Sequence, residues 1–275
     1  MLAPATVQAY AELADWLQAR QRAGARVVGI NGAQGSGKST LARWLAAELG
    51  RRGLRVATLS LDDCYLGRAA RAELAARVHP LLATRGVPGT HDVALGQRLL
   101  RDLPRLAAGT EQALPTFDKA GDERIDATAA RAQAGPVDLL LFEGWCVGTP
   151  PQAAAQLARP CNALEAREDA DGRWRAWVNA QLAGPYAQWW AGYDALVMLR
   201  VPGWEAVHNW RAQQERETAA AAPDGRAPLL EPAALQRFLQ HYERLTRHTL
   251  HTLPERADAL LELDLAHSVH VARLS

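Results

Sequence analysis

Gly32-Ala33-Gln34-Gly35-Ser36-Gly37-Lys38-Ser39-Thr40 is a glycine-rich run whose first eight residues match G-x-x-x-x-G-K-[ST] in full. Glycines let the backbone curl so that successive amide N–H groups point at one cluster of phosphate oxygens. We expect these nine residues to bind the phosphates of ATP, with Lys38 reaching the β- and γ-phosphates and the Ser39 hydroxyl binding Mg²⁺. A chance match is the alternative, and average residue usage gives roughly one per hundred chains of this length.

The residues on either side of this run favour a binding site over a chance match. Residues 26–31 (RVVGIN) form a short β-branched stretch ending near glycine, which predicts a buried strand. Residues 38–49 carry an apolar stripe at helical spacing, which predicts a helix that starts at Lys38. The positive N-terminal end of that helix would face the same anion.

Further apolar runs of strand length alternate with helical patterns along the chain. The predicted strands are Val56–Leu61, Val137–Phe142, Ala195–Val201 and Ala259–Leu265, and the clearest helical patterns cover 4–22, 93–103 and 232–249. Strands that are apolar throughout and alternate with helices are typical of a parallel sheet covered on both sides. We therefore predict an α/β P-loop NTPase fold with a five-stranded parallel sheet flanked by helices on both faces, in one domain over residues 1–275 with an N-terminal helix within 1–22.

Composition limits the classes of partner. The 275 residues carry 31 Lys and Arg against 30 Asp and Glu, a net charge of +1, so no basic excess points to nucleic acid. The N-terminal stretch lacks the basic start of a signal peptide, and no apolar run is long enough to cross a bilayer. The three cysteines are widely spaced and suggest neither disulfides nor zinc. We expect a cytoplasmic protein without membrane or nucleic-acid partners, either a monomer or a homodimer.

Acidic residues follow two of the predicted strands. Asp62 and Asp63 come after the second strand, and Glu143 ends the third. Ligands of doubly wound sheets bind beyond the carboxyl ends of the strands, so these acids are candidates for contact with a substrate hydroxyl and with Mg²⁺, the latter through Glu143 and Asp62. The structural alternatives are helix capping by Asp63 and a hydrogen bond from Glu143 to a neighbouring loop.

Several short segments resemble one family. Together with 32–40, these stretches are similar to the D-glycerate 3-kinase family, which is related to uridine kinase and phosphoribulokinase among P-loop kinases. They are SLDDCY (60–65), GTHD (89–92), LPTFDK (114–119), LFEGWCVG (141–148), VNAQL (178–182) and WRAQQE (210–215). The resemblance implies an ATP- and Mg²⁺-dependent kinase that phosphorylates the hydroxyl of a small molecule, with D-glycerate as acceptor and 3-phosphoglycerate as product.

The resemblance also implies roles for individual residues. Asp62 would be the general base, with Asp63 as the other candidate, and Lys38 and Arg211 would stabilise the transferring phosphoryl group. Arg211 lies in a segment, 204–218, that resembles the lid of such kinases, and Arg216 is a weaker candidate there. The residues that would face the acceptor are Asp63, Tyr65, His91, Asp92, Lys119, Arg124 and Trp145, with Lys119 and Arg124 as the cations for a carboxylate.

Two departures from the family leave the acceptor open. Cys64 stands where an aromatic residue usually follows the aspartate pair, and the stretch 118–124 is shorter than in plant-like members. A nucleoside, pantothenate or a sugar phosphate remains possible as acceptor. An ATP-driven switch or chaperone without a small acceptor is an alternative from another class, whereas the N-K-x-D motif of GTPases is missing after the fourth predicted strand.

Overall fold

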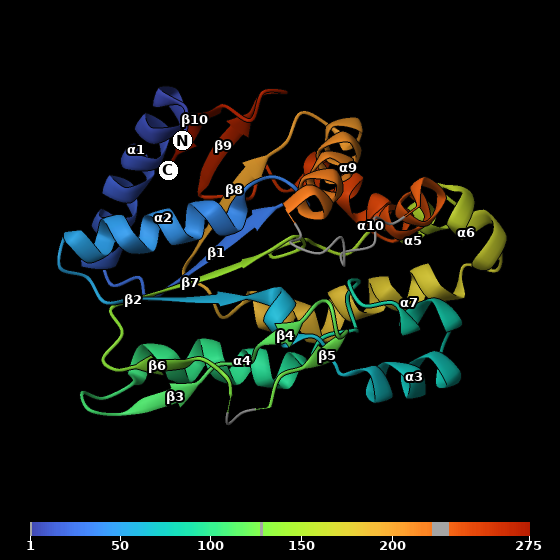
Figure 1. Cartoon of the computed structure of the whole chain (residues 1–275), viewed down its shortest axis with the longest axis horizontal. Helices are drawn as coiled ribbons and strands as arrows, with labels where there is room; N and C mark the ends of the chain where they lie inside the picture. The colour runs from blue at the N-terminus through green and yellow to red at the C-terminus, as the bar shows by residue number, and fades with distance from the viewer. Residues whose placement is uncertain (1, 127–128, 222–230) are drawn as a thin grey trace.

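The computed structural model describes residues 2–126, 129–221 and 231–275, and among these the side chains of 214–221 are not described. A central sheet of six strands runs through the middle of the molecule (Figure 1) in the order β10-β9-β8-β1-β7-β2. These strands are β1 (Val27–Gly32), β2 (Val56–Ser60), β7 (Leu139–Gly144), β8 (Ala195–Arg200), β9 (Ala259–Leu263) and β10 (Val269–Leu274).

The prediction of five parallel strands is correct for five of them and misses a sixth. β9, β8, β1, β7 and β2 pair in parallel, whereas β10 pairs with β9 in the antiparallel sense. β10 covers what would otherwise be an exposed edge of the sheet. Its sequence alternates Val269 and Val271 with polar residues, and only Val269 is fully buried, so it lacks the continuous apolar run of the central strands.

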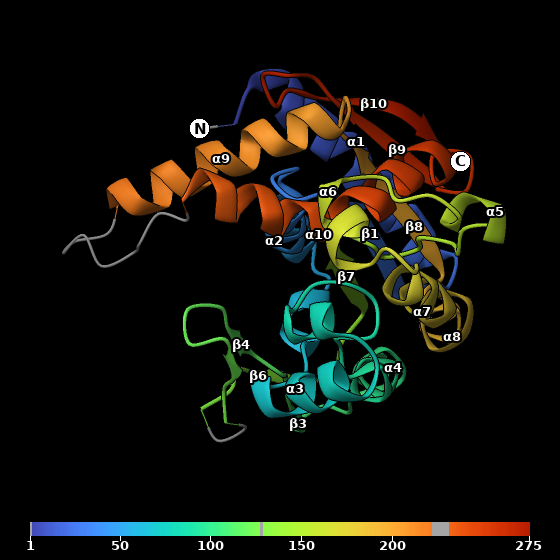
Figure 2. The ribbon, with the colours of Figure 1, turned by 90° about the vertical axis from the view of Figure 1, so that its right-hand side faces the viewer.

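Helices cover both faces of the sheet because each central strand has apolar side chains on both sides. On β7, Leu139 and Leu141 belong to one buried cluster, and Leu140 and Phe142 belong to the other. The first cluster includes residues of α1 (Pro4–Arg22), α2 (Lys38–Arg51) and α9 (Trp204–Ala221); the second includes residues of α3 (Arg68–Arg77), α4 (Val93–Asp102), α7 (Arg173–Gln181) and α8 (Ala187–Trp190). Figures 1 and 2 show the two layers.

The remaining elements are short, apart from α10 (Pro232–Thr252), which contributes to both clusters. The region 109–136 forms two small antiparallel ladders, β3 with β6 and β4 with β5. The short elements are η1 (Leu61–Cys64), η2 (Pro80–Ala83), η3 (Leu103–Arg105), η4 (Leu182–Tyr186), α5 (Ala154–Leu157), α6 (Ala163–Glu168), β3 (Glu111–Ala113), β4 (Phe117–Asp118), β5 (Glu123–Arg124) and β6 (Ala132–Ala134).

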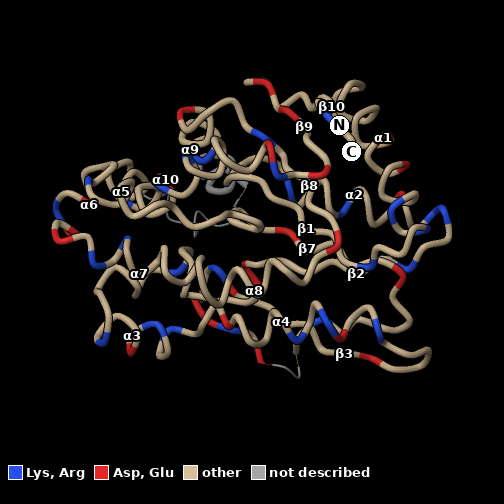
Figure 3. Tube along the Cα trace, turned by 180° about the vertical axis from the view of Figure 1, so that it is seen from behind, with Lys and Arg blue, Asp and Glu red and all other residues tan. Residues whose placement is uncertain are grey.

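The surface and the helices agree with the composition. Lys and Arg are interspersed with Asp and Glu along the chain rather than separated onto two faces (Figure 3). Within the described ranges, no helix combines the length and the apolar character needed to cross a bilayer.

Candidate active site

The glycine-rich loop joins the end of β1 to the start of α2, as the sequence predicts. Gly35 and Gly37 have φ values of 78° and 82°, in the left-handed region that favours glycine. A Cβ on Gly35 would also lie 3.0 Å from the Cβ of Trp210. Ser36 Oγ and Gln34 Oε1 are buried, and neither has a hydrogen-bond partner among the described residues. A curled backbone at a helix N-terminus, with the unpartnered Ser36 hydroxyl as a further donor, is suited to an anionic ligand.

Ser39, Lys38 and Glu143 meet beside this loop because β1 and β7 are neighbours in the sheet. The Ser39 hydroxyl donates a hydrogen bond to Glu143 Oε1 at 2.7 Å, and Lys38 Nζ lies 4.0 Å from Glu143 Oε2. Glu143 is only 6% exposed, and its Oε2 accepts no hydrogen bond from the described part of the chain. Hard oxygen donors of this kind suit Mg²⁺, so the hydroxyl of Ser39 and the carboxylate of Glu143 fit the metal site expected there.

Asp62 lies in η1, directly after β2, and lines the same cavity as Lys38, Ser39 and Glu143. Its carboxylate accepts a hydrogen bond from the Tyr65 hydroxyl at 2.9 Å and pairs with Lys119 Nζ at 2.5 Å. Burial alone would raise the pKa of Asp62, but the charges of Lys119 and Lys38 outweigh burial and lower the pKa to about 2. The carboxylate is therefore ionised and held in place at neutral pH.

A cavity of about 640 Å³ connects the phosphate loop to these acidic residues. Most of the residues predicted from sequence line it: Gln34, Gly35, Gly37, Lys38, Ser39, Thr40, Asp62, Tyr65, Lys119, Glu143, Trp145 and Arg211. Gly32, Ala33 and Ser36 complete the loop without lining the cavity. The side chain of Arg216 lies outside the described residues.

Asp63 does not line this cavity but an adjoining smaller one of about 330 Å³, together with Arg131, Ser39 and Glu143. Burial is the main cause that raises the pKa of Asp63 to about 6, with Arg131 opposing the rise. The two neighbouring aspartates therefore have opposite electrostatic environments. Only Asp62 shares a cavity with Lys38.

Three residues expected to face the acceptor lie behind the cavity wall. His91 is buried, stacks on Tyr65 with ring centroids 4.5 Å apart, and bonds Tyr186 through Nδ1 at 2.6 Å. Burial lowers the pKa of His91 to about 3. Asp92 caps α4 by accepting a hydrogen bond from the Leu95 N–H, and it pairs with Arg124 at 3.3 Å. In this geometry they support Tyr65 and α4 rather than line the cavity.

Sequence reasoning missed several lining residues, of which Arg85 is the most informative. It lies in the irregular region 79–92, and such long loops often build sites, which is the signal that could have found it. The Arg85 guanidinium pairs with Asp122 and donates to the Lys119 carbonyl at 3.0 Å. Asp122 also pairs with Arg71, which is fully buried, at 2.6 Å. Asp122 thus joins the loop that carries Lys119 to the body of the protein.

Aromatic residues from two distant segments form another part of the wall. Trp210 of α9 and His267 of the β9–β10 turn lie with ring centroids 3.9 Å apart, and both line the cavity. Trp145 donates from Nε1 to the Gly86 carbonyl at 3.0 Å and contacts Tyr242 edge-on. His267 could not be expected from the sequence, because β10 was not predicted.

Comparison with known proteins agrees with this geometry. The chain is similar to the uncharacterized kinase mug58 of Schizosaccharomyces pombe, with 34% identity over 229 residues that cover 78% of each chain. It is also similar to the chloroplastic D-glycerate 3-kinase of Arabidopsis thaliana, with 30% identity over 227 residues, covering 79% of this chain and 47% of that protein. The chain belongs to the D-glycerate 3-kinase-like family of P-loop kinases.

A solved structure shows that this kinase also shares the fold of the family. The D-glycerate 3-kinase of Cryptococcus neoformans var. grubii superposes with a TM-score of 0.74 at 24% identity, covering 95% of this chain and 98% of that one. One family model matches the N-terminal part of the kinase, residues 5–67, and describes the methylmalonyl-CoA mutase-associated GTPase MeaB. That match includes α1, the phosphate loop and η1 but none of the later strands.

Proposed function

We propose that this kinase transfers the γ-phosphoryl group of ATP to the primary hydroxyl of D-glycerate, which gives ADP and 3-phosphoglycerate. One observation carries the proposal: Asp62, Lys119 and Lys38 share one cavity with the phosphate loop. In this proposal, Asp62 would contact the acceptor hydroxyl and Lys119 the acceptor carboxylate, beside the site for the phosphates. The similarity to a D-glycerate 3-kinase supports the choice of acceptor.

In the proposed reaction, Asp62 orients the acceptor hydroxyl and takes its proton as the oxygen bonds to the γ-phosphorus and the bond to ADP breaks. Tyr65 holds one carboxylate oxygen of Asp62 through its 2.9 Å hydrogen bond. Lys38 and Arg211 neutralise charge on the transferring group, because phosphoryl transfer is catalysed chiefly by positioning and electrostatics. Bound Mg²⁺ would add charge neutralisation at the phosphates, held by Ser39 and Glu143.

The carboxylate of glycerate needs a cation, and Lys119 and Arg85 both line the cavity that contains Asp62. Lys119 contacts Asp62 directly, and Arg85 is linked to Lys119 through the Lys119 carbonyl. Arg85 takes the place that we expected for Arg124, which is paired with Asp92 outside the cavity. The positive charges of Lys119 and Arg85 favour an acidic acceptor over a neutral nucleoside.

The adenine of ATP would lie against Trp210 and His267. Trp210, His267 and the loop residue Gly35 all line the same cavity. An aromatic wall next to a phosphate site suits a nucleobase, because the base can stack on it. In the same proposal, α9 acts as the lid, because it carries both Trp210 and Arg211 to the cavity.

An ATP-driven switch is the second candidate, and the match of residues 5–67 to a GTPase family favours it. Such a protein would hydrolyse nucleotide without a small acceptor. The convergence of Lys119 and Arg85 near Asp62 argues against it, because a switch that uses water as acceptor needs no cations for a second substrate.

The test is to measure ADP release by the purified chain with ATP, Mg²⁺ and a panel of acceptors: D-glycerate, L-glycerate, uridine, pantothenate and ribulose 5-phosphate. We expect turnover with D-glycerate, and phosphorus NMR of the product should show 3-phosphoglycerate rather than the 2-phosphate. A Lys38→Met variant serves as the inactive control. Turnover that does not depend on any acceptor would favour the switch, and a strong preference for another acceptor would refute glycerate.

A further inference from the structure

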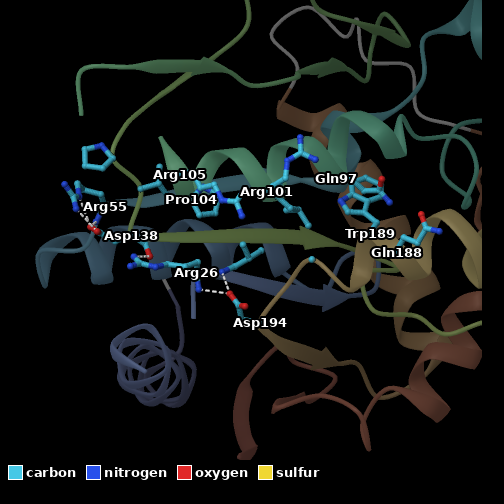
Figure 4. Close-up of a pocket in the computed structure, with 15 residues that line it drawn as sticks. Arg26, Arg55, Gln97, Arg101, Pro104, Arg105, Asp138, Gln188, Trp189 and Asp194 are labelled. Carbon is cyan, nitrogen blue, oxygen red and sulfur yellow. Dashed lines mark hydrogen bonds and ion pairs between the residues drawn. The ribbon is translucent and has the colours of Figure 1, made fainter. Parts of the chain in front are cut away.

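A second and larger cavity, of about 880 Å³, lies at the opposite end of the sheet from the phosphate loop. It is built where parallel strands begin: Val27 starts β1, and Asp138 and Asp194 directly precede β7 and β8. The end of α4 and the short helix η3 form the other side (Figure 4). None of these residues takes part in the proposed phosphoryl transfer.

Four arginines line this cavity: Arg26, Arg55, Arg101 and Arg105. Arg26 and Arg55 come from the sheet side, and Arg101 and Arg105 come from α4 and η3 opposite them (Figure 4). Only two acidic residues line the cavity with them. Because the whole chain carries a net charge of only +1, four guanidinium groups around one cavity are a local concentration of positive charge.

The two aspartates are already engaged by other groups. Asp194 accepts hydrogen bonds from the backbone N–H groups of Arg26 and Val27 at 2.7 and 2.8 Å, which fixes the start of β1. Asp138 forms a two-pronged pair with Arg55 at 2.7 and 2.6 Å. The hydrogen bonds from Arg55 are the main cause that lowers the pKa of Asp138 to about 2. Asp138 is therefore ionised at neutral pH, and both carboxylates hold the strand starts.

The side chains of Arg101 and Arg105, on the α4 and η3 side of the cavity, have fewer hydrogen-bond and ion-pair partners. Arg105 makes neither a hydrogen bond nor an ion pair with any residue in the described ranges, although η3 brings it to the cavity. Arg101 pairs only with its own neighbour Asp102, at 2.8 Å, in an exposed position. Exposed pairs of this kind contribute little and exchange readily with other anions. An incoming anion would thus meet at least two guanidinium groups without displacing a structural contact.

We propose that this cavity binds a small organic polyanion, with two or more phosphate or carboxylate groups on a compact carbon skeleton. The planar forks of arginine match the oxygens of both groups. Apolar lining from Val27, Leu100 and Val137 would contact the skeleton. The volume lies in the range of small-molecule pockets, roughly 300–1,000 Å³. β1 runs from this cavity directly to the phosphate loop.

The test measures binding by calorimetry, with fructose 1,6-bisphosphate as the phosphate probe and citrate as the carboxylate probe. Both are titrated into the full chain carrying Lys38→Ala, so that the phosphate loop contributes little affinity, and magnesium is omitted because citrate binds it. The site is removed by the double substitution Arg101→Gln/Arg105→Gln. The matched control is Arg22→Gln/Arg98→Gln, which removes the same charge from exposed arginines that do not line the cavity.

We expect saturable binding of at least one probe, weakened about ten- to a hundredfold by the Arg101/Arg105 substitutions and little by the control pair, since each charge-assisted hydrogen bond contributes that order of affinity. Affinity should also fall as salt is raised. Glucose and acetate should not bind. The proposal is overturned if neither probe binds saturably, or if both double variants weaken binding equally, which would show only non-specific attraction to positive charge. Binding of one probe alone identifies the charged group.

Discussion

Replacing Asp62 with asparagine tests the centre of the proposed mechanism. Asparagine keeps the size of the side chain and an oxygen that can accept the hydrogen bond from Tyr65, but it removes the negative charge that pairs with Lys119. A general base contributes about 10²–10⁴-fold to a rate. We expect a loss near 10²-fold in kcat, because a carboxylate with a pKa of about 2 is a weak base. This loss corresponds to about 2.7 kcal/mol of barrier.

The same substitution should change stability in a pH-dependent way. The pKa of Asp62 is lowered from 3.8 to about 2, so its ionised form stabilises the folded state above pH 4, and this contribution disappears as the pH falls through 2. The shift corresponds to at most about 2 kcal/mol, since Lys119 is largely exposed and the pair is screened by solvent. The variant should therefore melt at a lower temperature than the parent at pH 7, and the difference should vanish near pH 2.

The assay combines steady-state ADP release with calorimetric ATP binding and thermal melts followed by circular dichroism. Asp63→Asn is the matched control, because it removes a neighbouring carboxylate that lines the other cavity. ATP affinity should be nearly unchanged in both variants. Wild-type turnover by Asp62→Asn would refute the role of Asp62, and an equal loss in Asp63→Asn would show that the two aspartates cannot be separated by their cavities.

Three other predictions follow from contacts around the site and in the core. Lys119→Met should raise the pKa of Asp62, and so move the acid limb of the pH profile of kcat/KM to higher pH; an unshifted limb would count against the pair. Trp210→Ala should raise KM for ATP about tenfold with little change in kcat, since stacking of a base on an aromatic ring contributes about 1–3 kcal/mol. An unchanged KM would show that Trp210 does not contact the adenine. Arg244→Met should lower the free energy of unfolding in urea by about 3–5 kcal/mol, because the fully buried Glu165 loses its ion-pair partner. A loss below 1 kcal/mol would mean that another group compensates the charge of Glu165.

The sequence predicted the elements that carry the phosphate loop because their signals are local. The strand expected at 26–31 is observed at Val27–Gly32, and α2 begins at Lys38 as expected. β2 ends one residue earlier than predicted, since the Ser60 hydroxyl accepts a hydrogen bond from the Asp62 N–H and starts η1. Periodicity and glycine positions fix these features without reference to the rest of the chain.

The missed features depend on contacts between distant segments. β10 is stabilised by pairing with β9 and by packing beneath α1, where Thr6 Oγ accepts from the Val269 N–H, so its own sequence carries a weak signal. Arg85 is held at the cavity by Asp122 and by the Lys119 carbonyl, which lie more than 30 residues further along the chain. Family resemblance predicted Lys119, which lines the cavity, but it could not show that Arg124 pairs with Asp92 instead.

The double pairing of Asp122 bears on how acceptor preference can change in this family. Asp122 belongs to the same turn as Lys119, yet its counter-ions come from two other segments: Arg71 and, at 4.0 Å, Arg68 from α3, and Arg85 from the loop before α4. If the turn alone were exchanged for that of a relative, Arg71 would remain fully enclosed without a counter-charge, at a cost of several kcal/mol. We therefore expect acceptor selectivity to transfer from one relative to another only when Arg71, Arg85 and the turn are exchanged together. Single substitutions are therefore poor guides to how these enzymes diverged.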